Sequence, residues 1–235
     1  MQDAKRIIED LKTKDVFDFN DLCSLVRVLR SEDGCPWDRE QTNKSIRNEF
    51  IDETYEFIEG LDTDSDSLMC EELGDVLFQI VFHAAIKEET DTFNMSDVIS
   101  GICKKMILRH PHVFGQTQVD SSAQVLVNWE NIKNDEKHRN TPYSQLDSIS
   151  KALPSLMRCQ KLIKKADKTG LDKLGTKEEY IERLEDAISS YKISGDTELI
   201  GKMLFAICGI AKTQDVDAEE LLYKENNSYL DSFKV

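Results

Sequence analysis

The chain has 235 residues, of which 45 are acidic and 30 are basic, and its formal net charge is −15. This charge argues against general binding to nucleic acid or to an anionic membrane, so a polyanionic substrate would require a metal ion and local basic residues. No segment reaches the apolar length of a membrane span, and the first residues, MQDAKRIIEDLK, lack the apolar core of a signal peptide. The six cysteines show no C-x-x-C spacing. We therefore expect a cytoplasmic protein with reduced structural thiols.

Helical periodicity runs through most of the chain and strand alternation is scarce, which predicts an all-α fold. A helix over residues 20–30, capped by Asn20, is expected before a loop at residues 34–38. A later helix over residues 96–109 should end at His110-Pro111. The polar stretch at residues 134–148 is typical of a linker, and further helices should follow it.

An acidic face marks the helix expected over residues 46–61. Its acids are Glu49, Asp52, Glu53, Glu56 and Glu59. Like charges three or four residues apart destabilise a helix, and Arg47 is the only basic residue in the segment. An external cation would relieve this repulsion. Taken alone, such a face is usually a solvated helix surface.

A polar stripe crosses the next helix, expected over residues 68–86. The stripe consists of Glu72, Asp75, Gln79 and His83, and nearly everything else from Val76 onward is apolar. The segment should therefore be buried on most sides. Carboxylates in such surroundings must be neutralised, paired with a cation or bound to a metal.

An antiparallel hairpin of these two helices would bring two acid pairs face to face. The pairs are Glu53-x-x-Glu56 and Glu72-x-x-Asp75, and the polar link at residues 62–67 allows the turn. Four convergent carboxylates without Cys or His form a hard-oxygen site, which suits Mg²⁺ or Mn²⁺. His110 and His112 are two residues apart but have no third ligand with suitable spacing, so we do not expect a metal there.

The second half of the chain repeats the first. LGDVLFQIVFHA, starting at Leu73, matches IGKMLFAICGIA, starting at Ile200, and Glu53-x-x-Glu56 matches Glu179-x-x-Glu182. The apolar skeleton survives in the second copy, where we expect Leu204 and Phe205 to be buried. The charged groups do not survive. Glu72 and Asp75 fall opposite Leu199 and Lys202, while Lys105 and Arg109 fall opposite Ser228 and Ser232. We predict an intact domain at residues 1–140, a linker at 141–153 and a degenerate domain at 154–235.

Several strings together resemble the MazG family of nucleoside triphosphate pyrophosphohydrolases. They are GCPWDREQT, DETYE, EELGD, KKMILRHPHVFG and NWENIKNDEK. The resemblance implies tandem MazG-like helical bundles, a homodimer, and Mg²⁺-dependent cleavage of nucleoside triphosphates to monophosphate and pyrophosphate, with a housekeeping role in the nucleotide pool. The second unit departs from the family pattern, so activity must depend on the first unit.

The chemistry assigns roles to individual residues. Glu53, Glu56, Glu72 and Asp75 would hold the metal, with Glu53 as the preferred general base and Asp52 as the second choice. Lys105 and Arg109, four residues apart on one helix, would contact phosphate oxygens. Trp37 could stack on the base or could instead cap the core, and His83 could donate a hydrogen bond to the site.

Two other functions fit parts of the pattern. A helical di-iron protein would need E-x-x-H pairs, whereas the residues at these positions are Glu56 and Asp75. A non-catalytic dimerisation or regulatory protein that binds nucleotides would fit the decayed second unit, but the intact acidic and basic sets of the first unit argue against it.

Overall fold

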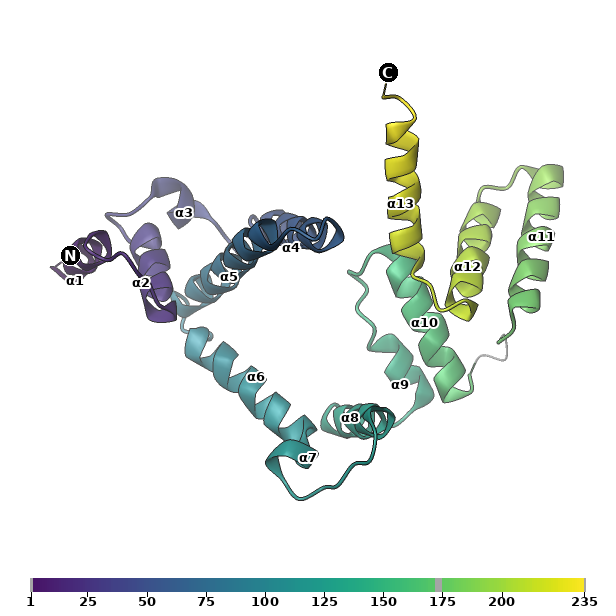
Figure 1. The fold of residues 1–235 in the computed structure, drawn as a ribbon, viewed down its shortest axis with the longest axis horizontal. Helices are drawn as coiled ribbons and strands as arrows, with labels where there is room; N and C mark the ends of the chain where they lie inside the picture. Colours follow the sequence, from purple (N-terminus) through teal and green to yellow (C-terminus); the bar gives the residue numbers. More distant parts are fainter. Residues whose placement is uncertain (1, 172–174, 235) are drawn as a thin grey trace. The chain divides into compact units, whose positions relative to one another are not determined.

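The computed structural model describes residues 2–171 and 175–234, which form helices and no strands, and this confirms the all-α fold (Figure 1). The chain divides into two compact units, residues 1–117 and 118–235. The first unit contains α1 (Gln2–Lys12), α2 (Phe19–Arg30), α3 (Pro36–Glu40), α4 (Arg47–Asp62), α5 (Asp66–Glu88), α6 (Met95–Arg109) and α7 (Pro111–Phe114). The second contains α8 (Ser122–Glu136), α9 (Pro142–Asp147), α10 (Ser155–Thr169), α11 (Lys177–Ser194), α12 (Glu198–Thr213) and α13 (Ala218–Asp231).

Local capping fixes where the main helices of the first unit begin. The carboxylate of Asp18 accepts the backbone N–H groups of Asn20 and Asp21, so Asp18, and not Asn20, caps α2. The cap expected from the sequence, Asn20, lies two residues too late. The side chains of Asp18 and Asn20 can both accept a backbone N–H, so residue type alone does not distinguish them. Asn94 caps α6 in the same way, and Ser65 caps α5.

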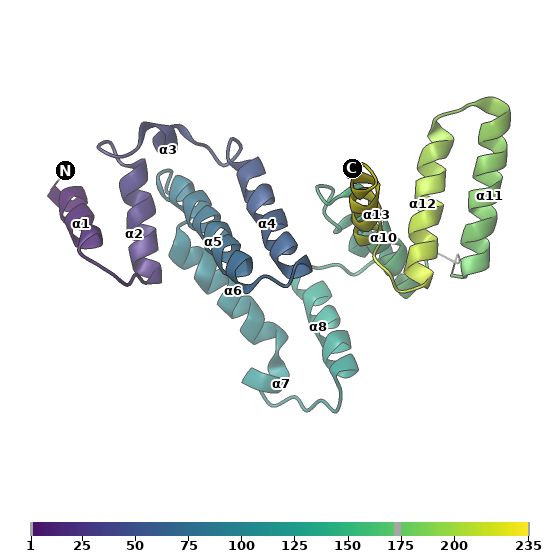
Figure 2. The same cartoon turned by 45° about the horizontal axis from the view of Figure 1, so that its top comes forward.

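A helical hairpin of α4 and α5 forms the centre of the first unit, and the two helices lie side by side in both views (Figures 1 and 2). Helix α5 also packs on α2 and α6. The core consists of Cys23, Val26, Ile46, Val81, Phe82 and Ala85. Apart from Glu72, the buried residues of α5 lie in its C-terminal half, and Leu73 and Leu77 are 52% and 38% exposed. The expectation that α5 is buried on most sides therefore fails near Glu72.

One buried arginine ties three elements of the first unit together. The guanidinium of Arg30 donates to both carboxylate oxygens of Glu89, at 2.6 and 2.8 Å, and lies over the ring of Phe82. It also donates to the backbone carbonyls of Asp38 and Gln41, at 2.5 and 3.2 Å. These bonds hold the short helix α3, where a loop was expected, against α2 and the end of α5.

The second unit is built around the hairpin of α11 and α12, which packs on α10 (Figure 2). Its core consists of Ile163, Tyr180, Cys208, Ala211 and Ala218. The buried positions of α12 reproduce those of α5 when the matched strings are superposed, because Ala206, Cys208, Gly209 and Ala211 fall opposite Gln79, Val81, Phe82 and Ala84. This agreement supports the match between α5 and α12.

The boundary between the units lies earlier than the predicted one at residue 140. It falls between residues 117 and 118, so α8 belongs to the second unit. The predicted linker at residues 141–153 contains α9, which Thr141 caps and which packs on α10. The polar composition of this stretch thus reflects a short, exposed helix. Among the described helices, none combines the length and the apolar content needed to span a membrane.

Candidate metal centre

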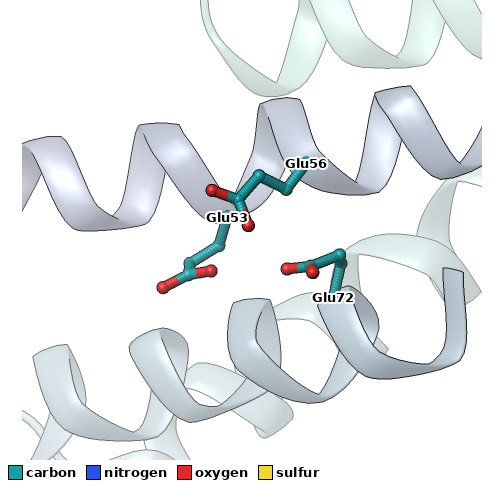
Figure 3. Close-up of side chains that lie close together, drawn as sticks. All are labelled: Glu53, Glu56 and Glu72. Atoms are coloured by element: carbon teal, nitrogen blue, oxygen red, sulfur yellow. The ribbon is translucent and has the colours of Figure 1, made fainter. Parts of the chain in front are cut away.

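Three carboxylates meet inside the α4–α5 hairpin. Glu53 and Glu56 project from α4 toward Glu72 on α5, and one oxygen of each lies within 4.8 Å of the other two (Figure 3). Glu72 is only 5% exposed, Glu53 is partly buried, and Glu56 is exposed. The hairpin thus presents a set of oxygen donors that ranges from buried to solvent-facing, which is the donor chemistry of Mg²⁺ and Mn²⁺ sites.

The two helices approach each other closely between this cluster and the turn that joins them. Gly60 is buried near the end of α4, and a Cβ atom there would lie 3.0 Å from the backbone nitrogen of Met69. The carbonyl of Gly60 accepts the N–H of Ser65 at 2.9 Å, which closes the turn. Glycine therefore allows α4 and α5 to pack closely next to the turn, one helical turn from Glu56 and Glu72.

The electrostatics of the cluster are unfavourable without a cation. Burial raises the pKa of Glu72, and the charges of Glu56, Asp75, Glu53 and Glu71 raise it further. The buried Oε2 atom of Glu72 has no hydrogen-bond partner. A buried carboxylate oxygen without a donor and surrounded by like charges is costly, and a divalent cation would satisfy it. The residues present therefore fit a hard metal ion.

The preferred general base also has a raised pKa. Burial is the largest cause for Glu53, followed by the charges of Asp75, Glu56 and Asp52, while a hydrogen bond with Glu72 opposes the shift. Asp75 lies outside the close set of three carboxylates and is exposed, so it acts on the set through its charge. Asp52 is exposed as well and influences Glu53 in the same way.

The raised pKa of Glu72 predicts a pH-dependent effect of removing its charge. A raised pKa means that the folded state binds the proton more tightly, so the cost to stability is present above the ordinary glutamate pKa and disappears when the group is protonated. Metal-free Glu72→Gln should therefore melt at a higher temperature than the wild type near pH 7.5, and the difference should shrink toward about pH 4. Thermal melting at both pH values tests this, and a destabilised variant at pH 7.5 would contradict it.

The polar stripe of α5 continues beyond the acids with Gln79 and His83. The amide oxygen of Gln79 is buried and has no hydrogen-bond partner. Nδ1 of His83 lies 2.7 Å from the amide nitrogen of Asn43, which also donates to the His83 carbonyl at 3.1 Å. Accepting this bond leaves the ring proton on Nε2. Burial lowers the pKa of His83, which favours the neutral ring. The sequence analysis missed Asn43, which lies in an irregular segment with no periodic signal.

The structure places the expected phosphate contacts on α6 and the expected base contact on α3. On α6, Lys105 is partly buried and Arg109 is 5% exposed. The charges that shift the pKa values of Glu53 and Glu72 are those of neighbouring acids. Trp37 lies in α3 and is 57% exposed, so it does not cap the core. Nδ1 of His110 lies 2.6 Å from the backbone carbonyl of Met106, at the end of α6.

The position in the second unit that corresponds to the acidic cluster is a pocket of about 310 Å³. Leu199 and Lys202, which match Glu72 and Asp75, line it together with Arg183, Asp186, Ala187, Ser190 and Phe205. Neither Glu179 nor Glu182 lines this pocket. Matching Glu179-x-x-Glu182 to Glu53-x-x-Glu56 is therefore wrong, and Arg183-x-x-Asp186 has the corresponding spacing across from Leu199 and Lys202. The exposed fractions of Leu204 and Phe205, 46% and 37%, also correct the expectation that they are buried.

Glu179 has a local structural role that explains its presence. Its carboxylate accepts the N–H groups of Gly175 and Thr176, both at 3.1 Å, and the Thr176 hydroxyl accepts the N–H of Glu179. The hydrogen bond from the Thr176 backbone is the largest cause of the lowered pKa of Glu179. A helix-capping glutamate is thus mistaken for a metal ligand when only the string is compared.

This role predicts how the two glutamates of the second unit respond to substitution. Glu179→Gln with Glu182→Gln should keep nearly wild-type turnover and melting temperature, because Gln can still accept the capping bonds. Glu179→Ala should also keep turnover but should lower the melting temperature. Turnover and melting of both variants test this. Loss of turnover without a change in melting temperature would show that the second unit contributes to the reaction.

The fold and the site define a class, namely all-α proteins with facing carboxylates in a helical hairpin. Residues 41–114 match the MazG nucleotide pyrophosphohydrolase domain. The chain is 37% identical over 220 residues to the nucleoside triphosphate pyrophosphohydrolase/pyrophosphatase MazG of Thermotoga maritima, covering 92% of this chain and 84% of that protein. It is 35% identical over 225 residues to the nucleoside triphosphate pyrophosphohydrolase of Escherichia coli strain K12, covering 91% and 84%. The chain belongs to the MazG family.

The matched domain coincides with the acidic hairpin of the first unit. It includes Asn43 and all four predicted metal ligands, Glu53, Glu56, Glu72 and Asp75. A further relative, the uncharacterized protein YabN of Bacillus subtilis, is 46% identical over 147 residues, covering 63% of this chain and 30% of that protein.

Proposed function

We propose that the chain hydrolyses nucleoside triphosphates to nucleoside monophosphate and pyrophosphate, with Mg²⁺ as cofactor and Mn²⁺ as a possible substitute. The observation that carries this proposal is the set of Glu53, Glu56 and Glu72, with raised pKa values for Glu53 and Glu72 and a buried oxygen on Glu72 that lacks a donor. The names of the Thermotoga maritima and Escherichia coli relatives state the same activity. Housekeeping of the nucleotide pool, the biological role that the family implies, belongs to this proposal.

Each acid contributes a distinct part of the reaction. Glu56, Glu72 and Asp75, with Glu53, would hold Mg²⁺, which would neutralise phosphate charge and lower the pKa of a bound water. Glu53 is the preferred acceptor of the proton from that water because burial and neighbouring charges raise its pKa. Asp52 remains the second choice, since it is exposed and one position from Glu53.

Groups outside the cluster would bind the nucleotide itself. Lys105 and Arg109 would contact the phosphate oxygens from α6, which packs on α5. The exposed ring of Trp37 is available to stack on a base. In this proposal the nucleotide bridges the three helices, with its base at α3 and its phosphates between α5 and α6.

We further propose a cytoplasmic homodimer. The α4–α5 hairpin leaves apolar side chains exposed close to the acids, including Leu61, Leu73 and Leu77 at 51%, 52% and 38%. Covering such side chains with a second copy would remove apolar surface from water. Light scattering after gel filtration measures the mass in solution, and a monomer at working concentration would contradict this part.

The proposed reaction is tested by product analysis. Purified protein would be incubated with a panel of ribo- and deoxynucleoside triphosphates and Mg²⁺, and the products would be separated by anion-exchange chromatography. We expect monophosphate and pyrophosphate in equal amounts, and no turnover when EDTA removes the metal. Diphosphate with orthophosphate would overturn the proposed bond cleavage, and nucleotide binding without turnover would favour the regulatory alternative.

A further inference from the structure

A strongly basic pocket lies within the second unit, away from the α11–α12 hairpin. Its volume is about 440 Å³, and residues of α8, α9, α10 and the segments that flank α9 line it. The cations of its lining are Lys133, Arg139, Lys161, Lys164, Lys165 and Lys168. Glu130 is the acid that lines it. Such a concentration of positive charge is unexpected in a chain with a net charge of −15.

Four of these lysines form one face of α10. Their spacing, Lys161, Lys164, Lys165 and Lys168, is that of neighbours on a helix surface. The opposite face holds Ile163 and Ala166, which are 2% and 8% exposed. Like charges at these spacings destabilise a helix, so this face carries a cost that an anion in the pocket would remove.

Glu130 pairs with two of the lysines on this face of α10. Lys165 donates to one carboxylate oxygen of Glu130, and Lys168 lies 3.4 Å from the other. The bond from Lys165 is the largest cause of the lowered pKa of Glu130. Within the part of the chain that the structure describes, Lys161 and Lys164 form no ion pair. Both side chains are exposed and therefore accessible to a ligand.

Polar and apolar groups complete the pocket. Gln145, Ser148 and Ser150 add amide and hydroxyl groups, while Ile149 and Leu153 add apolar surface. Lysine ammonium groups act as point charges that suit phosphate oxygens, and hydroxyl groups can donate to the same oxygens. The acidic character of the rest of the chain favours a compact anion over an extended nucleic acid.

We propose that this pocket binds the di- or triphosphate chain of a small molecule, either free or as part of a nucleotide. The exposed Lys161 and Lys164, which form no ion pair among the described residues, supply the positive charge that such a chain requires, while Lys165 and Lys168 share Glu130. This site needs no metal and lies in the unit that lacks the acidic cluster. The inference therefore stands apart from the proposed hydrolysis.

Calorimetric titration of the full chain with inorganic tripolyphosphate in EDTA tests the proposal, because removing divalent cations eliminates metal-dependent binding at the acidic cluster. We expect binding that weakens with added salt. Lys161→Gln with Lys164→Gln should weaken it by roughly tenfold or more, since each charge-assisted contact is worth about tenfold in affinity. Lys161→Arg with Lys164→Arg should retain most of it.

Matched variants separate this site from other sources of binding. Lys177→Gln with Lys192→Gln removes the same charge from α11 in the same unit and should leave binding unchanged. Glu56→Gln, in the acidic cluster, should also leave it unchanged, which keeps this test independent of the proposed reaction. Pyrophosphate and ATP, titrated in the same way, should both bind if the phosphate chain is what is recognised.

Three results would overturn the proposal. They are no binding of tripolyphosphate to the wild type, equal weakening by the α11 control variant, and binding of ATP without binding of tripolyphosphate. Circular dichroism of each variant verifies that its helices are intact, so that a loss of binding is attributed to the pocket.

Discussion

Replacing Glu72 by Gln should lower the rate of pyrophosphate release by on the order of 100-fold or more. Mutating even a residue that only hydrogen-bonds to a metal ligand typically lowers metal affinity or activity by about 10–100-fold. Glu72 is the most buried of the three converging carboxylates, and one of its oxygens has no donor in the protein. Glu56→Gln should produce a similar loss. Turnover would be measured over a range of Mg²⁺ concentrations, where weakened metal binding should shift the activity curve to higher Mg²⁺.

A matched control separates loss of a ligand from loss of negative charge. Glu59 is also an exposed acid of α4 but is not part of the close set of carboxylates, so Glu59→Gln should keep nearly full activity. Circular dichroism should show the same helical content in all three variants. Full turnover by either Glu56→Gln or Glu72→Gln would rule out the metal-site assignment.

Gly209→Ala should destabilise the second unit by about 1–3 kcal/mol, the usual cost of overpacking a core. A Cβ atom at Gly209 would lie 2.2 Å from Cδ1 of the Tyr180 ring, and this ring is 0% exposed. The aromatic ring is rigid and enclosed, so relief requires a shift of α11 against α12. Thermal and denaturant unfolding measure the change in free energy.

Gly201 supplies the control on the same helix. A Cβ atom there would have no heavy atom within 4 Å, so Gly201→Ala should stabilise α12 by up to about 1 kcal/mol through helix propensity alone. The two substitutions are chemically identical and should act with opposite sign. Equal effects on unfolding would show that the close packing of Tyr180 on Gly209 does not control stability.

The sequence was sufficient to predict the acidic hairpin because its signals are periodic. Glu53 and Glu56 are three residues apart, close to one helical turn, so they lie on one face of α4. Glu72 is an acid next to the apolar part of α5. The two patterns together indicate which sides of α4 and α5 face each other. The short link between the helices then leaves an antiparallel arrangement as the simple solution. The burial of Glu72 and its raised pKa agree with this reasoning.

The register of the second hairpin could not be predicted in the same way. The apolar string of α12 is long enough to align with α5, but Glu179-x-x-Glu182 is a four-residue match that capping can also produce. Helix α11 begins at Lys177, which places Glu179 in its first turn. Which turn of α11 faces Lys202 depends on the packing of Tyr180 against Gly209, and no local pattern encodes such a long-range contact.

The irregular parts of the site were equally inaccessible. Asn43 reaches His83 across the fold, and Arg30 positions α3, with Trp37 on it, through backbone carbonyls. These contacts join residues that are distant in sequence, and several of their acceptors are backbone carbonyl groups, which every residue has. Side-chain periodicity carries no information about them.

The two cores take their large aromatic ring from different helices of the hairpin, and this limits any attempt to engineer a second active centre. In the first unit a large ring comes from Phe82 of α5, whereas in the second unit Tyr180 of α11 packs over Gly209, which aligns with Phe82. Grafting α5 as a block in place of α12 would place two rings in the volume of one. A designer would have to transplant both helices of the hairpin together, or exchange only surface positions such as Arg183 and Lys202.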